Sequence, residues 1–156
     1  MLLPFVIAWT RVTVKKILAP IDRSKYKEKI IAYAIYLGKL WGAEITTIHV
    51  IDPGRGIPGG RIKEKELERE EEAKRPAQEL LAEVDLQAKI RSINIKKEIV
   101  EESDTVGKAI IEYARKNNID LIVIGTTGMS GIEKIFLGSV ANDVIQHAHC
   151  PVFAVR

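Results

Sequence analysis

A chain of 156 residues, 46% hydrophobic and 29% charged, has the length and composition of one soluble globular domain. Its net charge of +3 is small and its basic residues are mixed with acidic ones, so the composition gives no indication of nucleic-acid binding. The single cysteine, Cys150, excludes an internal disulfide and fits a reducing compartment, and we therefore expect a cytoplasmic protein.

Residues 1–13 are expected to be an N-terminal extension that packs on the domain or on a partner. Residues 2–9 are an apolar run, but the run is too short to span a bilayer and no basic residue precedes it. A signal segment and a misplaced start codon are the alternatives. We expect no membrane association, and we place a single domain at residues 14–156.

The first half of this domain alternates between strand-like and helix-like patterns. Residues 14–21 form an apolar run that predicts the first strand, and residues 45–51 are β-branched and predict a second, central strand. Between them, Asp22 and Ser24 can cap a helix that Gly42 ends. Residues 63–75 are a dense charge run typical of a solvated helix. Pro76 then suits a kink or a fresh helix start, and residues 76–90 carry the stripe that packs on the sheet.

The second half continues the alternation. Residues 93–100 carry charge and suit an edge strand. Ser103 or Asp104 is expected to cap the next helix, which Asn117 and Asn118 end. The continuous apolar run at residues 121–124 predicts a buried strand, a glycine-punctuated loop and a helix from Gly138 follow, and residues 152–155 form the last strand.

Alternation of this kind predicts an α/β fold, a doubly wound parallel sheet of five strands with helices on both faces. The two most apolar strands, at residues 45–51 and 121–124, should flank the first strand, which gives the order 3-2-1-4-5. Ligands of such sheets bind beyond the carboxyl ends of the strands, where the strand order reverses. Asp22 and Gly125 then lie on either side of one crevice.

Two phosphate-binding motifs can be tested against the chain. No glycine is placed to complete a P-loop. Residues 54–59 match G-x-G-x-x-G after a strand, but Pro58 interrupts the loop and a charged segment follows, so we interpret this match as a decoy.

A more specific pattern is Gly125-x2-Gly128-x9-Gly138-Ser139. With it, the chain resembles the universal stress protein family, whose nucleotide-binding members carry G-x2-G-x9-G-[ST] after the fourth strand. Residues 17–22, 48–52 and 150–155 are similar to the family's first, second and closing strands. The resemblance implies an adenine nucleotide alpha-hydrolase-like fold and a nucleotide-dependent sensor or switch in stress response.

The resemblance also implies a ligand, ATP or else AMP or ADP, with Mg²⁺ bridging the phosphates. For the metal, Glu133 and Asp143 are candidates only. Gly125 and Gly128 are expected to take positive φ and bring backbone N–H groups to the ligand, while the helix start at Gly138 and Ser139 favours a phosphate. The expected binding residues are Pro20, Asp22, Val50, Gly125, Thr126, Thr127, Gly128, Met129, Ser130, Gly131, Gly138, Ser139 and Val140.

Simpler structural roles compete with these functions. Asp22 could be only a helix cap, and His49, in a predicted buried strand, is interpreted as a hydrogen-bonded core histidine. His147 and His149 have metal-ligand chemistry, but residues two apart on a helix do not share a face, which argues against a zinc site.

The last strand, residues 152–155, is apolar and predicted at a sheet edge, which indicates a homodimer through antiparallel pairing of two copies, as is common in the family. We expect at most weak ATPase activity, because no general base is evident beside the loop. A slow ATPase or adenylate-handling enzyme, and a dimeric interaction module that binds no nucleotide, are the alternatives.

Overall fold

The computed structural model describes residues 13–51, 63–101, 104–127 and 137–156, and its centre is one parallel sheet. Its strands are β1 (Lys16–Pro20), β2 (Glu44–Ile51), β3 (Ile95–Glu101), β4 (Leu121–Gly125) and β5 (Val152–Val155). They lie in the order β3-β2-β1-β4-β5, and every pair of neighbours is parallel. The predicted fold class and strand order are therefore confirmed, including the positions of β2 and β4 on either side of β1.

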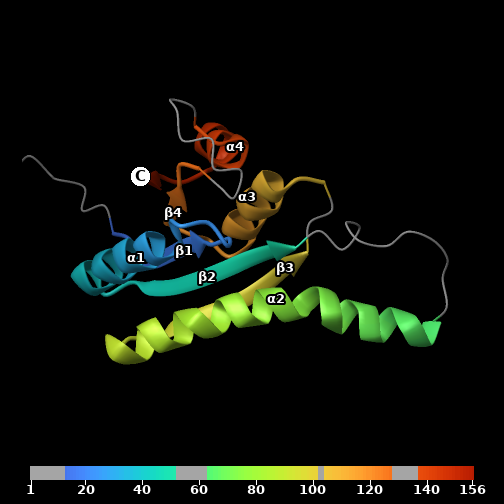
Figure 1. Cartoon of the computed structure of the whole chain (residues 1–156). Helices are drawn as coiled ribbons and strands as arrows, with labels where there is room; N and C mark the ends of the chain where they lie inside the picture. Colours follow the sequence, from blue (N-terminus) through green and yellow to red (C-terminus); the bar gives the residue numbers. More distant parts are fainter. Residues whose placement is uncertain (1–12, 52–62, 102–103, 128–136) are drawn as a thin grey trace, which may run out of the picture.

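Within the described ranges, four helices cover the two faces of this sheet (Figure 1). They are α1 (Lys27–Trp41), α2 (Lys63–Ile90), α3 (Val106–Lys116) and α4 (Ser139–His147). Two separate clusters of buried side chains form, one under α1 and α2 and the other under α3 and α4. In β1, Ile17 belongs to the first cluster and Leu18 to the second, and both are fully buried. A strand covered on both faces reads as a continuous apolar run, which explains the pattern seen in the sequence.

The helix starts differ from the prediction. The first helix begins at Lys27 instead of Asp22, because the Asp22 carboxylate accepts a hydrogen bond from the Ser24 N–H (3.0 Å) and stabilises a turn that precedes α1. No side chain caps α1 itself. The cap of α3 is Thr105, whose extended backbone lets its hydroxyl accept from the Lys108 N–H (3.2 Å). The expectation of Ser103 or Asp104 at that position was wrong.

Pro76 lies inside α2, which runs unbroken from Lys63 to Ile90, so a fresh helix start at Pro76 is excluded. Proline has no N–H to donate to the preceding turn. Its own carbonyl accepts a hydrogen bond from the Arg23 guanidinium at 3.2 Å, and the same guanidinium contacts Glu79 at 3.4 Å. The segment that follows β1 is thereby attached to α2.

The two outer strands differ in chemistry. β3 is an edge strand, as predicted, and it is lined by charge pairs such as Lys97 with Asp85 and Lys96 with Glu98. β5, at the opposite edge, carries Phe153, which is 37% exposed and contacts the Tyr33 ring at 5.3 Å between centroids. Among the described helices, none combines the length and the apolar composition that crossing a bilayer requires.

Candidate functional site

The carboxyl ends of β1 and β4 meet at the centre of one sheet edge. The two strands pair in parallel, with Ile17 opposite Leu121 and Leu18 opposite Ile122. After β1 the chain turns to α1 on one face, and the helix that follows β4 is α4 on the other face. This is the reversal of strand order at which ligands of doubly wound sheets bind. The reversal of strand order therefore lies where the sequence predicts it.

Two backbone hydrogen bonds fix the described ends of the glycine motif. The Thr126 N–H donates to the carbonyl of Val155 at 2.9 Å, which extends the contact between β4 and β5 by one residue. The Gly138 N–H donates to the Thr126 carbonyl at 2.7 Å. The two ends of the motif, although far apart in the sequence, consequently lie side by side next to the end of β4.

The N-terminus of α4 lies in this region, and a helix N-terminus can attract an anion. Gly138 is its N-cap, no side-chain hydrogen bond caps it, and its first turn contains no acidic residue. The first N–H groups of a helix have no intrahelical acceptor, and the helix dipole places partial positive charge there. Ser139 adds an exposed hydroxyl to the same turn. This arrangement can bind a phosphate through backbone N–H groups.

Gly125 does not have the conformation predicted for it. Among the described glycines, only Gly42 has a positive φ, whereas Gly125 is the last residue of β4 and pairs with Val155. A Cβ at Gly125 would lie 3.2 Å from Ile30 Cδ1 and 3.5 Å from Tyr26 Cβ. The missing side chain therefore allows α1 to approach the end of β4 closely, and the expectation of a positive φ there was wrong.

The remaining described candidates lie along the same edge. Pro20 is buried at the end of β1, and Asp22, two residues further, is partly exposed with one carboxylate oxygen bonded to the Ser24 N–H. Val50 is partly exposed near the end of β2. His49 makes a 2.8 Å hydrogen bond through Nδ1 to the Ile21 carbonyl, so the prediction of a hydrogen-bonded ring is confirmed, but the residue is partly exposed and is not part of the buried core.

Several predicted features lie outside the described residues. These are Gly128, Met129, Ser130, Gly131 and Glu133, together with residues 54–59 and most of the N-terminal extension. Thr127 and Val140, which flank the undescribed part of the loop, are both partly buried.

Asp143 is engaged in contacts between helices. Its carboxylate lies 2.9 Å from His147 Nδ1, and a Cβ built at Gly107 would come within 2.3 Å of its other oxygen. The first turn of α3 therefore packs closely against α4, and Asp143 is a poor choice as a ligand for a phosphate-bound metal. Within the residues that the structure describes, no three histidine, cysteine or carboxylate side chains gather as a metal site would require.

Val100 and Val106 also lie at this end of the sheet, and the sequence did not indicate either as a candidate site residue. Both are partly buried and pack on the cluster under α3 and α4, as Val50 and Val140 do. The sequence could indicate the position of Val100 only indirectly, because Val100 becomes a neighbour of Val50 through the pairing of β2 with β3.

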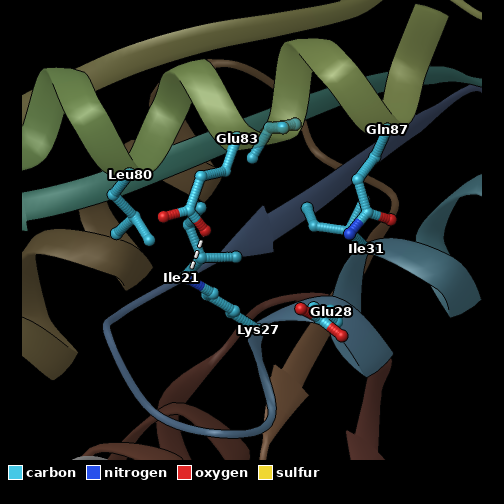
Figure 2. Close-up of a pocket in the computed structure, with 8 residues that line it drawn as sticks. Ile21, Lys27, Glu28, Ile31, Leu80, Glu83 and Gln87 are labelled. Atoms are coloured by element: carbon cyan, nitrogen blue, oxygen red, sulfur yellow. Dashed lines mark hydrogen bonds and ion pairs between the residues drawn. The ribbon is translucent and has the colours of Figure 1, made fainter. Parts of the chain in front are cut away.

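A small hollow lies elsewhere among the described residues, between α1 and α2 (Figure 2). Ile21, Ile31, Leu80 and Val84 form its apolar part, and the ion pair between Lys27 and Glu83 crosses its opening. Its cavity volume of about 10 Å³ is near the lower limit for one water molecule. The hollow is a gap in helix packing, and we base the site on the carboxyl edge because the strand topology and the α4 N-terminus coincide there.

Cys150 is not an activated thiol. It is partly buried just before β5, and its burial, followed by the charge of Asp120, raises the pKa of the thiol above its ordinary value. A raised pKa keeps the thiol protonated at neutral pH, and the thiolate is the reactive form. A nucleophilic role for Cys150 is therefore not supported.

The fold is adenine nucleotide alpha-hydrolase-like: in the described residues, an all-parallel five-stranded sheet whose strand order reverses near the N-terminus of α4. The sequence model of the universal stress protein family matches residues 13–156, and the chain belongs to that family. A universal stress protein of Methanocaldococcus jannaschii is 40% identical over 146 residues, covering 91% of this chain and 82% of the relative.

Solved structures of the family share the fold. The protein UspA of Lactobacillus plantarum superposes with a TM-score of 0.75 at 24% identity, covering 92% of this chain and 98% of that one. An Archaeoglobus fulgidus universal stress protein solved in complex with dAMP has a TM-score of 0.63 at 21% identity, covering 93% and 99%. A further universal stress protein, solved in complex with cAMP, has a TM-score of 0.68 at 20% identity, covering 92% and 98%.

Proposed function

We propose that this protein binds an adenine nucleotide, ATP with Mg²⁺, at the carboxyl edge of the sheet and acts in the cytoplasm as a nucleotide-dependent switch in stress response. The observation that carries the proposal is the uncapped N-terminus of α4, held beside the end of β4 by the bond from Gly138 to Thr126. The complexes of two family members with dAMP and cAMP support an adenine nucleotide as the ligand.

Each part of the nucleotide has a proposed partner. The phosphates bind the first N–H groups of α4 and the Ser139 hydroxyl, where the helix dipole favours negative charge. Asp22 has one carboxylate oxygen bonded to Ser24, and we assign its other oxygen to the ribose or base as acceptor. The backbone of Val50 meets the adenine edge, as the family resemblance implies. Mg²⁺ would accompany the phosphates and neutralise part of their charge.

Binding should raise the melting temperature of the purified, ligand-free protein. A ligand that binds only the native state at a hundred times its dissociation constant adds about 2.7 kcal/mol, which corresponds to several degrees for a chain of this length. We expect this rise with Mg-ATP and a smaller one with Mg-GTP, measured by scanning calorimetry. Equal shifts with both nucleotides would contradict an adenine site, and no shift at millimolar ATP would contradict nucleotide binding.

A substitution at Gly138, the N-cap of α4, tests where the nucleotide binds. Gly138 has φ −59° and ψ 151°, which other residues also adopt, so Gly138→Val is expected to fold and to lose the ATP-dependent shift because its side chain occupies the space of the phosphate. Gln146→Val, an exposed position near the other end of α4, is the matched control and should keep the shift. Multiple-turnover phosphate release by the wild-type protein would instead favour the enzyme alternative.

We propose further that the protein is a homodimer paired through β5. This edge strand exposes Phe153, and antiparallel pairing of two copies would satisfy its open backbone groups. Light scattering should give about twice the chain mass of 17.4 kDa. Phe153→Glu should shift the protein to monomer, because pairing would bring two carboxylates together without partners. Leu86→Glu, at an exposed position on α2, should stay dimeric, and a monomeric wild-type protein would refute the pairing.

A further inference from the structure

An open depression is formed by the N-terminal half of α1, the end of α2 and the residue that follows β5. Its volume is about 680 Å³, far larger than that of the hollow between α1 and α2. We call this surface the basic depression, because four of its eight lining residues are basic and one is acidic. The lining residues are Lys25, Tyr26, Glu28, Lys29, Ala32, Gln87, Arg91 and Arg156.

The fold brings these basic side chains together from three separate parts of the chain. Lys25 lies in the turn that leads into α1, and Lys29 lies in the first turn of that helix. Arg91 directly follows α2, and its carbonyl accepts a hydrogen bond from Lys39 Nζ at 2.8 Å, which fixes the end of α2 beside α1. Figure 2 shows Gln87 extending from α2 toward α1. All four basic residues of the depression are exposed to solvent.

The hydrogen bonds of these cations leave positive charge available to a ligand. Arg91 donates through Nη1 to the side-chain and main-chain oxygens of Gln87, at 3.1 and 3.4 Å, and both acceptors belong to neutral amides. Lys29 Nζ donates to the main-chain oxygen of Arg156 at 2.7 Å, and an ammonium group has two further donors. In the described part of the chain, neither the Arg91 nor the Arg156 guanidinium forms an ion pair with a carboxylate side chain.

The distribution of charge indicates the class of ligand. A ligand that contacts cations from all three segments must carry several anionic groups. The acidic side chains of a protein supply carboxylates, and a carboxylate can accept two hydrogen bonds from one guanidinium group. Glu28 would repel an unbroken row of phosphates, such as a nucleic acid carries, whereas a protein segment can place an N–H donor against it.

We propose that the basic depression docks an acidic segment of a partner protein. Arg91 and Arg156 bind carboxylates of the partner, and Gln87 provides an amide that can pair with the partner's main chain. Individual pairs at an exposed surface are weak, so the affinity comes from several pairs formed together and decreases as salt is added. The proposal does not rest on nucleotide binding, and its test needs no nucleotide.

Fluorescence anisotropy with a labelled peptide of alternating glutamate and alanine residues, at low salt and without ATP, tests the docking. We expect saturable binding to the wild-type protein. Arg91→Glu should lower the affinity at least about fivefold, because the reversed charge repels the peptide. Arg115→Glu is the matched control and should bind as the wild-type protein does. Arg115 is likewise an exposed arginine at the C-terminal end of a helix, α3, and the change in net charge is the same.

Three results would overturn the docking proposal. One is the absence of saturable binding to the wild-type protein. Another is an equal loss in Arg91→Glu and Arg115→Glu, because the peptide would then respond only to net charge. The third is tighter binding of a labelled single-stranded DNA of the same charge that Arg91→Glu abolishes, since the surface would then belong to a nucleic acid. If circular dichroism shows that Arg91→Glu does not fold, Arg156→Glu decides against the same control, with an expected loss of at least about threefold.

Discussion

Replacing Ile122 by alanine is expected to lower the free energy of unfolding by about 3–4 kcal/mol, within the range of about 2–5 for a buried isoleucine. Ile122 is fully buried in β4, with Leu18 opposite it in β1 and Val152 opposite it in β5. Strands on both sides and helices α3 and α4 above it leave little room for the structure to collapse into the cavity. Urea unfolding followed by circular dichroism measures the loss.

The matched control is the same substitution at Ile145, which is 42% exposed on α4. Ile145→Ala deletes the same atoms where they are partly in water, so we expect a loss below about 0.5 kcal/mol. Similar losses for the two variants would mean that β4 is not the centre of the cluster of buried side chains under α3 and α4.

Gly38→Val should cost about 3 kcal/mol, although glycine is normally a poor helix residue. Gly38 lies in α1, and a Cβ built there would lie 2.6 Å from Ile45 Cδ1 and 2.8 Å from Ile45 Cγ1. Ile45 is buried in β2 and has little freedom to move away. The cost of overpacking therefore exceeds the gain in helix propensity, and thermal and urea unfolding should both show the loss.

A second substitution tests whether contact with Ile45 causes the loss of stability in Gly38→Val. Ile45→Ala removes the atoms that Gly38→Val would strike, so the double variant should be more stable than the sum of the two losses by at least about 1 kcal/mol. Gly42→Ala is the control, because a Cβ built at Gly42 would meet no atom within 4 Å, whereas its φ is 66°. Its cost of about 1 kcal/mol arises from the left-handed backbone and should simply add to that of Ile45→Ala.

The sheet could be predicted because its strands are covered on both faces. Buried parallel strands such as β1 and β4 leave apolar runs bounded by glycine or acidic residues, and the relative hydrophobicity of the runs gave their order. The helix caps could not be predicted with equal precision. Asp104 and Thr105 are adjacent and are both capping residue types, and only the backbone conformation shows that Thr105 reaches the Lys108 N–H.

The positions of the described ends of the glycine motif could be predicted. The described ends of the glycine motif, Gly125 and Gly138, lie where the spacing indicated, because they bound a strand and a helix whose patterns are strong. The role of Gly125 was misjudged because its close neighbour Ile30 comes from α1, far away in the sequence. Val100 was missed for the same reason, since its partner Val50 is separated from it by a whole helix.

The hydrogen bond from Gly138 to Thr126 also bears on the thermodynamics of ligand capture. Bringing Thr126 and Gly138 together reduces the conformational entropy of the chain between them, and this cost grows only slowly with the length of the segment. A ligand that contacts both ends can bind only after this entropy has been lost. Here the bond, at 2.7 Å, joins those ends as part of the fold. The cost therefore belongs to folding, and more of the interaction energy with a phosphate remains for affinity. Substitutions that weaken this contact should therefore reduce the affinity for a ligand that contacts both ends.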